Sequence, residues 1–462
     1  MTADTPESEL QAFLAAHPEV THVDAYLNDL NTVERGKRVD RAALEGLYRD
    51  GMLLPGSMFA LDVLGGTVQA TGLGFDEGDA DRPCRPLPGS LVTIPWQTPG
   101  LAQMQLSMYE PDGRPFHADP RHVLVKVLDR LHRLNLTPVV AIEYEFYFID
   151  RARTALGQPQ PPPLPITQRR EFQTQINSMT YLNEYSEILS KIYRACEQQG
   201  VPATGALAEY GPGQFEVNLL HRADALQACD EALRFKRIVR SIAREYGWDA
   251  TFLPKPYREM AGSGMHVHVS LLDAGGRNLF ECPDPARHEG RPASAELRHA
   301  LAGMLSTLGD GMALCAPGPN SYRRFRAESY VPLTPGWSIN NRGSALRIPV
   351  SDDRNRRIEH RLAGADANPY LVVAWILAGI HHGLAESLEP PPAIEGNAYR
   401  ASGDRLPIHW ATAIERFERS DFAAHYLGRP FRDLYSTVKR AELEDFDSHV
   451  TPLEVAWFMS AL

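Results

Sequence analysis

The stretch AIEYEFYFID, residues 141–150, combines the pattern of a β-strand with two carboxylates in its middle. Its aromatic and branched residues favour a pleated strand, in which successive side chains point to opposite faces of the sheet. Glu143 and Glu145 are two residues apart, so both carboxylates should project from one face, roughly 6–7 Å apart. Two like charges this close, among apolar neighbours, are costly unless something positive lies between them. The stretch therefore predicts a strand whose polar face meets a cation.

Three further segments have the same alternation of polar and apolar residues. Surface strands of antiparallel sheets also alternate in this way, and that explanation stays open for any one segment. Four segments lined by Glu and His rather than by Lys, Thr and Ser favour a functional sheet face instead. The segments are AEYGPGQFEVNL (208–219, with Glu209, Gln214, Glu216 and Asn218), GSGMHVHVSL (262–271, with His266, His268 and Ser270) and RRIEHRL (356–362, with Arg357, Glu359 and Arg361).

The donor types in these segments indicate which metal would bind. Oxygen-rich sites with an imidazole suit Mg²⁺ or Mn²⁺, whereas tetrahedral zinc prefers Cys and several His. Five carboxylates on one sheet face need more positive charge than one divalent ion supplies. The sequence therefore predicts two Mg²⁺ or Mn²⁺ ions.

Six arginines accompany the four segments. Arginine suits bidentate capture of phosphate and carboxylate, although any one of the six has an ordinary salt bridge as its alternative. Divalent ions facing several arginines are typical of phosphoryl transfer. There is no GxxxxGK[ST] phosphate loop, which excludes a P-loop enzyme. The arginines are Arg324, Arg342, Arg347, Arg354, Arg357 and Arg361.

Composition limits the kinds of partner that the protein can bind and indicates its cellular compartment. The 462 residues carry a net charge of −11, which argues against a nucleic-acid or membrane-surface binder. The N-terminus lacks a signal pattern, and the longest apolar run, 370–380, is too short for a bilayer. Five scattered cysteines without a CxxC pair fit a reducing compartment, and we expect a cytoplasmic protein. The cysteines are Cys84, Cys196, Cys229, Cys282 and Cys315.

The chain divides into an N-terminal arm (1–17), a small strand-rich domain (18–116) and a large α+β domain (117–462). Residues 9–16 read as a helix, and 66–75 and 89–96 as short β-like runs. At the boundary, Asp119 can cap a helix whose first position suits Pro120. Further helices are expected at about 180–199 and 223–246.

In order, the segments IEYEF, AEYGPGQFEVNL, GSGMHVHVSL, NSYRRF, NNRGSALRIP and RRIEHRLAGADANPYL resemble the motif series of the glutamine synthetase family. The resemblance covers about residues 20–462. It implies an N-terminal β-grasp domain and a catalytic α+β domain with an antiparallel, metal-lined sheet. It also implies hexameric rings, usually stacked as dodecamers, with active sites between neighbouring subunits.

The resemblance implies roles by motif. It assigns Glu145, Glu209 and Glu216 to one metal ion, and Glu143, His266 and Glu359 to the other. For ATP it implies His268 and Ser270 at the nucleotide, with Arg342, Arg347, Arg354 and Arg357 around the phosphates. For glutamate it implies Gly262, Arg324 and Arg361.

Departures from the family pattern concern the nitrogen substrate. Ammonia-using members carry an aspartate in an N-terminal loop and a glutamate after the NSY motif, where this chain has Pro55 and Tyr330. An asparagine before the metal-binding histidine is replaced by Ala261. With both carboxylates lost, the chain resembles the γ-glutamylpolyamine synthetases of the family. That implies an ATP-dependent ligase joining glutamate to putrescine or a related small amine through γ-glutamyl phosphate. The candidate catalytic residues are Arg342, Tyr330 and Glu328.

Three alternatives stay open at this point. An ammonia-using glutamine synthetase is possible if Asp62 or Glu328 refills the ammonium pocket. A non-catalytic binding protein of this fold is disfavoured by the complete ligand set. A guanidino kinase is disfavoured by the N-terminal domain. Tyr399, near where some members carry an adenylylated tyrosine, is expected to be an ordinary exposed tyrosine.

Overall fold

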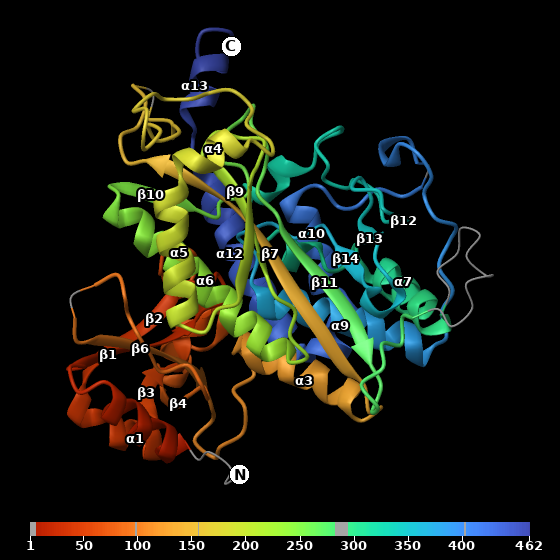
Figure 1. Cartoon of the computed structure of the whole chain (residues 1–462). Helices are drawn as coiled ribbons and strands as arrows, with labels where there is room; N and C mark the ends of the chain where they lie inside the picture. Colours follow the sequence, from red (N-terminus) through yellow and green to blue (C-terminus); the bar gives the residue numbers. More distant parts are fainter. Residues whose placement is uncertain (1–5, 98, 156, 282–293, 402) are drawn as a thin grey trace.

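The protein is described by a computed structural model covering residues 6–97, 99–155, 157–281, 294–401 and 403–462 (Figure 1). Two sheets organise the chain. The first lies in the N-terminal part, drawn in red and orange, and the second runs through the middle of the molecule, where β7 and β11 lie side by side. Residues 1–5 of the predicted arm and Cys282 lie outside the described residues.

The N-terminal sheet has six strands in the order β2-β1-β6-β4-β3, with β5 paired to β6. Strands β1 and β6 run parallel, and the other pairs of this sheet are antiparallel. Helices α1 (Pro6–Ala16) and α2 (Leu44–Asp50) belong to the same region. The strands are β1 (His22–Asn28), β2 (Glu34–Asp40), β3 (Met52–Pro55), β4 (Asp81–Pro86), β5 (Val92–Thr93) and β6 (Leu101–Met108).

The central sheet has eight strands in the order β12-β13-β14-β11-β7-β9-β8, with β10 paired to β7. Its pairs are antiparallel apart from β12 with β13, so the predicted antiparallel sheet is confirmed. The strands are β7 (Thr137–Asp150), β8 (Ala203–Ala208), β9 (Gln214–Leu219), β10 (Trp248–Thr251), β11 (Met265–Leu272), β12 (Trp337–Ile339), β13 (Leu346–Ile348) and β14 (Ile358–His360).

Helices cover one face of the central sheet. Phe235 of α6 (Ala225–Glu245) packs against the rings of Tyr144 and Phe146 on β7, and all three are fully buried. Because strand side chains alternate, Glu143 and Glu145 point to the opposite face. The remaining helices are α3 (Pro120–His132), α4 (Met179–Glu184), α5 (Ser186–Gln198), α7 (Ala295–Thr307), α8 (Met312–Cys315), α9 (Pro369–Ala385), α10 (Trp410–Glu418), α11 (Asp421–Ala423), α12 (Arg429–Ser448) and α13 (Pro452–Phe458).

The start of α3 follows the predicted capping. The Asp119 carboxylate accepts from Arg121 N at 2.9 Å, and Pro120 takes the first helical turn. The same carboxylate accepts from Ser107 Oγ at 2.7 Å and from Met108 N at 2.9 Å. Asp119 thereby ties the beginning of α3 to the end of β6.

One expectation about local structure was wrong. Residues 66–75 form turns and a short 3₁₀ helix at Gln69–Thr71 instead of a strand, because glycines interrupt the run and Gly72 adopts a left-handed φ of 79°. The helical structure expected at about 180–199 is confirmed by α4 and α5, which are separated by Tyr185. Its buried ring packs against Phe148, and its backbone (φ −98°, ψ 10°) leaves the helical region.

The four cysteines that the structure describes and the long apolar run are core residues. Cys84, Cys196, Cys229 and Cys315 are buried free thiols. The run at 370–380 lies inside α9, whose side chains there are buried. Among the described helices, none combines the length and the apolarity that a bilayer crossing requires.

Close packing of α7 on α9 generates a stability prediction. A Cβ built on Gly303 of α7 would lie 2.1 Å from Gly379 O and 2.6 Å from Gly383 Cα of α9. We expect Gly303→Ala to lower the free energy of unfolding by about 1–3 kcal/mol, because backbone atoms must move apart.

Gly46→Ala is the matched control. Gly46 lies in α2 with no atom within 4 Å of its added Cβ, so alanine should be neutral or stabilise by about 0.5–1 kcal/mol. Urea unfolding at fixed protein concentration measures both variants. Equal stability of Gly303→Ala and the wild type would contradict the tight helix contact.

Candidate active site

Strand register aligns the functional residues across the central sheet. In antiparallel pairs, directly opposed residues share a face with Cβ atoms about 4.5–5.5 Å apart. Each strand therefore contributes one or two polar side chains to one continuous row. The opposed pairs are Glu145 with Glu216 (β7 and β9), Glu143 with His266 (β7 and β11), His268 with Glu359 (β11 and β14) and Arg347 with Glu359 (β13 and β14).

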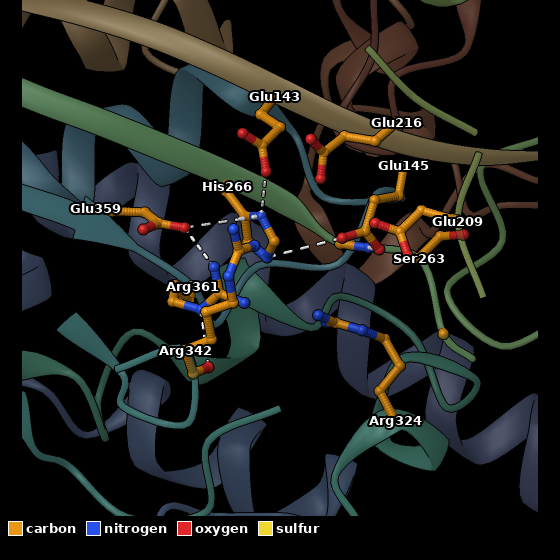
Figure 2. A network of polar contacts seen from close by, with 12 residues as sticks. Glu143, Glu145, Glu209, Glu216, Ser263, His266, Arg324, Arg342, Glu359 and Arg361 are labelled. Carbon is orange, nitrogen blue, oxygen red and sulfur yellow. Dashed lines mark hydrogen bonds and ion pairs between the residues drawn. The ribbon is translucent and has the colours of Figure 1, made fainter. Parts of the chain in front are cut away.

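Together with Glu209, the row forms three overlapping groups of potential metal-ligand atoms (Figure 2). Donor atoms of Glu145, Glu209 and Glu216, the residues assigned to the first ion, lie within 4.8 Å of one another. For the second ion, His266 Nδ1 lies 2.7 Å from Glu143 Oε1 and 4.0 Å from Glu359 Oε1. Glu143 also forms donor groups with Glu216 and His266, and with His268 and Glu359.

Neighbouring groups hold the carboxylates of the first group in place. Glu145 accepts from Gly264 N at 2.8 Å, and Glu209 accepts from Tyr210 N at 3.1 Å. Glu216 accepts from Asn218 Nδ2 at 3.2 Å. Each carboxylate keeps an oxygen free of these bonds, which suits a ligand for a hard divalent cation.

Without metal, the carboxylates of the cluster differ in pKa, so that some are protonated and others ionised at neutral pH. Burial, together with the charge of Glu145, raises the pKa of Glu209 to about 8. Burial, together with Glu143 and Glu145, raises the pKa of Glu216 to about 10. Burial opposes the charge of Glu143, but hydrogen bonds from His266 and His268 outweigh it and hold the pKa of Glu143 well below its usual value. The cluster thus lacks positive charge on the Glu209 and Glu216 side, as expected for a divalent-cation site.

Glu359 is held by two arginines. One oxygen pairs with Arg347 and the other with Arg361. Burial opposes the charge of Glu359, but the charges of Arg361, His266, His268 and Arg347 lower its pKa to about 2. Glu359 is therefore an anion before any metal ion binds.

Two cavities flank the cluster. The first, of about 430 Å³, contains four of the residues expected at the nucleotide: His268, Ser270, Arg354 and Arg357. The second, of about 310 Å³, contains Glu145, Glu209, Glu216 and His266 of the cluster. It also contains Gly262, Arg324 and Arg361, which were expected at glutamate, and Tyr330, which was expected at the acceptor. Arg342 lines this second cavity as well, although it was expected around the phosphates of ATP. The cluster therefore lies where the two cavities approach each other.

Arg324 is a buried cation at the second cavity. Its side chain is 3% exposed, Nη1 donates to Leu362 O at 3.2 Å, and Nε has no hydrogen-bond partner. Gly262 leaves room for it, because a Cβ there would lie 2.8 Å from Arg324 Cγ and 2.8 Å from Pro254 O. A buried guanidinium that lines a cavity suits an anionic ligand such as a carboxylate.

Several residues considered as parts of the amine-binding or ammonium-binding pocket do not line the second cavity. Glu328 is exposed and does not line the second cavity, although Tyr330, two residues later, does. Pro55 and Asp62 lie in the N-terminal part, where Asp62 accepts from Leu64 N and Gly66 N in a turn. Tyr399 is not the exposed side chain expected from sequence. It is half-buried, and its hydroxyl donates to Val331 O at 3.3 Å in the loop that carries Tyr330.

Sequence patterns do not reveal some of the lining residues. Asn278 donates to Arg354 O and Arg356 O, both at 2.9 Å, and so holds the arginine-bearing loop of the first cavity. Tyr210 lines the second cavity directly after Glu209. In the sequence, only the position of Tyr210 next to the predicted metal ligand Glu209 hints at a role in the site. A single tyrosine in a loop belongs to no recognisable pattern.

Comparisons with known proteins agree with this geometry. Residues 117–458 match the family model described as glutamine synthetase, catalytic domain. Gamma-glutamylputrescine synthetase PuuA of Escherichia coli is 43% identical over 98% of this chain and 94% of its own length. Gamma-glutamylethanolamide synthetase GlnA4 of Streptomyces coelicolor is 33% identical over 97% and 94%. A solved structure titled GmaS/ADP complex superposes with a TM-score of 0.84 at 27% identity, covering 98% of this chain and 99% of that one.

The chain belongs to the glutamine synthetase family. The predicted resemblance to γ-glutamylpolyamine synthetases is confirmed by the similarity to the putrescine enzyme.

The raised pKa values predict proton release on metal binding. At pH 7 the metal-free protein holds protons on Glu209 and Glu216, whose pKa values are about 8 and about 10. A divalent ion must displace both, so Mn²⁺ binding should release about two protons at pH 7 and fewer as the pH rises toward 10. Titration calorimetry in buffers of different ionisation enthalpy measures this number.

The matched control is Glu209→Gln, which should release about one proton. Because both folded-state pKa values lie above the unfolded value near 4.3, raising the pH should also destabilise the metal-free fold. Mn²⁺ should reverse that loss. Binding without proton release at pH 7 would contradict the assignment of these carboxylates as ligands.

Proposed function

We propose that this protein is an ATP-dependent ligase that joins the γ-carboxylate of glutamate to a primary amine, putrescine or a related polyamine, through γ-glutamyl phosphate. The observation that carries the proposal is the carboxylate–histidine cluster between a cavity lined by His268, Arg354 and Arg357 and a second cavity containing the buried Arg324. Family membership and the relatives' names as glutamate–amine ligases support the same reaction.

The cluster is proposed to hold two divalent ions, Mg²⁺ or Mn²⁺. Glu145, Glu209 and Glu216 would hold one, and Glu143, His266 and Glu359 the other. Bound there, the ions would neutralise phosphate charge and polarise the transferring oxygens. The donor set fits, because it is rich in oxygen and short of positive charge.

The protein's own residues would position the two substrates. Arg324, Arg361 and Gly262 are proposed to hold glutamate, with the Arg324 guanidinium paired to one of its carboxylates. His268 and Ser270 would contact the nucleotide. Arg342, Arg347, Arg354 and Arg357 are proposed around its phosphates, and Arg342 would stabilise charge on the transferring group.

The amine must attack as a free base. With a pKa near 10, only about one alkylamine molecule in a thousand is neutral at pH 7. The site must therefore favour the neutral form or accept a proton during attack. Tyr330 and Glu328 are the proposed amine-contacting residues, with Tyr330 in the cavity and Glu328 in the same loop.

The wider architecture is also part of the proposal. We infer a β-grasp domain over 18–116 after an N-terminal arm (1–17), and a catalytic domain over 117–462. Support comes from the separate N-terminal sheet, the start of α3 at Pro120 and the family match from residue 117. Two further points stay predictions. One is assembly into hexameric rings or dodecamers with active sites between neighbouring subunits, and the other is the cytoplasmic location.

Acceptor choice tests the reaction. Phosphate release is measured with glutamate, ATP and Mg²⁺ and with ammonium, putrescine, spermidine or ethanolamine as acceptor. We expect turnover with the diamine and little with ammonium, because Pro55 and Tyr330 stand where ammonia-using members carry carboxylates. Turnover with ammonium alone would overturn the proposal and favour a true glutamine synthetase.

Gly262→Ala tests the glutamate subsite. The added methyl would meet the Arg324 side chain, so the KM for glutamate should rise about tenfold or more. The KM for ATP should change little, because Gly262 does not line the first cavity. Gly318→Ala is the control, since its Cβ has no neighbour within 4 Å. Equal effects on both KM values would contradict the assigned roles.

A further inference from the structure

Two tyrosines from different loops lie next to each other at the second cavity. Tyr210 lies between β8 and β9, and Tyr330 lies in the segment before β12. Their ring centres are 6.3 Å apart, and the ring planes are inclined by 31°. Both line the cavity, yet Tyr210 is 42% and Tyr330 54% exposed. Two large rings that remain this accessible do not serve core packing.

The backbone fixes both rings over the cavity. Tyr210 N donates to Glu209 Oε2 at 3.1 Å, which couples the ring position to a carboxylate of the metal cluster. Tyr330 has a left-handed φ of 56°, an unfavourable conformation for a large residue. Hydrogen bonds on either side hold it there, from Ser329 Oγ to Arg326 O at 2.7 Å and from Tyr399 Oη to Val331 O at 3.3 Å. Strain that the surroundings maintain is typical of functional positions.

The pair has the geometry of a cation site. An ammonium is attracted to the face of an aromatic ring within about 6 Å of its centre. With ring centres 6.3 Å apart, one cation can satisfy that distance for both rings at once. Partial exposure also lets water complete the cation's hydrogen bonds, so desolvation costs less than in a closed cavity.

A diamine presents such a cation while its other end reacts. The reacting nitrogen must be neutral, but the second nitrogen keeps a pKa near 10 and stays protonated at pH 7. Two nitrogens separated by four methylenes are about 6 Å apart, from bonds of about 1.5 Å. Ammonium and simple monoamines have no second charge to place.

We propose that Tyr210 and Tyr330 together form a subsite for the second, non-reacting ammonium of a diamine. This inference rests on the proposed function and adds to it the basis of acceptor choice. The neutral rings bind the distal charge without adding another carboxylate near the metal cluster. The subsite therefore discriminates a diamine from a monoamine of equal chain length, and it assigns Tyr210 a role in acceptor specificity.

The test compares putrescine with n-butylamine, which has the same carbon chain without the second charge. The measured quantity is the ratio of kcat/KM for putrescine to kcat/KM for n-butylamine, by phosphate release. In Tyr210→Leu and in Tyr330→Leu we expect this ratio to fall about threefold to thirtyfold, in line with the loss of one cation–ring contact. The fall should appear in the KM for putrescine rather than in the KM for ATP.

Two comparison variants separate the ring from other effects. Tyr210→Phe keeps the aromatic face and should keep most of the ratio. Phe446→Leu removes an aromatic ring that is 44% exposed on α12 and should leave the ratio at its wild-type value. Tyr210→Leu removes the ring but retains the backbone N–H that donates to Glu209.

The outcomes separate this inference from the reaction itself. Wild-type turnover of putrescine with an unchanged ratio in both leucine variants would overturn the subsite and leave the ligase reaction standing. Wild-type turnover of ammonium alone would overturn both. A ratio that falls in Tyr210→Leu and recovers in Tyr210→Phe would support the subsite.

Discussion

Mutual repulsion of carboxylates on one sheet face is the constraint around which the site is built. The register of β7 against β9 and β11 sets Glu145 opposite Glu216 and Glu143 opposite His266, and no local rearrangement separates them without shifting a strand. The helix-covered face secures that register, because Tyr144 and Phe146 are buried against α6. Packing energy on one face thus maintains an unfavourable charge arrangement on the other.

The negative charge of the carboxylates is compensated in different ways at the two ends of the cluster. At the Glu359 end, Arg347 and Arg361 supply fixed positive charge, whereas Glu209 and Glu216 retain protons in the absence of metal. Glu359 is therefore already an anion before metal binds, and it lies on the side of the first cavity, whose lining residues include residues expected at the nucleotide. The second end is completed only by an added cation, next to the cavity that contains Arg324. The asymmetry suits a reaction in which a phosphoryl group passes from one cavity to the other.

Much of this site is predictable from the sequence, because strands impose a period of two. The alternation in 141–150 and in the other three segments is enough to place the polar residues on one face. Loops have no such period. The glycine-rich 66–75 has the composition of a strand but forms turns, no pattern marks Tyr210, and Tyr399 holds the Tyr330 loop through Val331 although its surroundings in the sequence suggest an exposed residue. Contacts between loop side chains depend on how the whole chain folds, and no local sequence pattern specifies them.

The central claim is that phosphate passes to glutamate before the amine attacks, and oxygen transfer tests it most directly. Glutamate labelled with ¹⁸O in its γ-carboxylate is incubated with ATP, Mg²⁺ and putrescine, and the released phosphate is analysed by mass spectrometry. One ¹⁸O is expected in the phosphate for each amide formed, because the carboxylate oxygen that attacks ATP leaves with the phosphate. Amide formation with unlabelled phosphate would contradict γ-glutamyl phosphate as the intermediate.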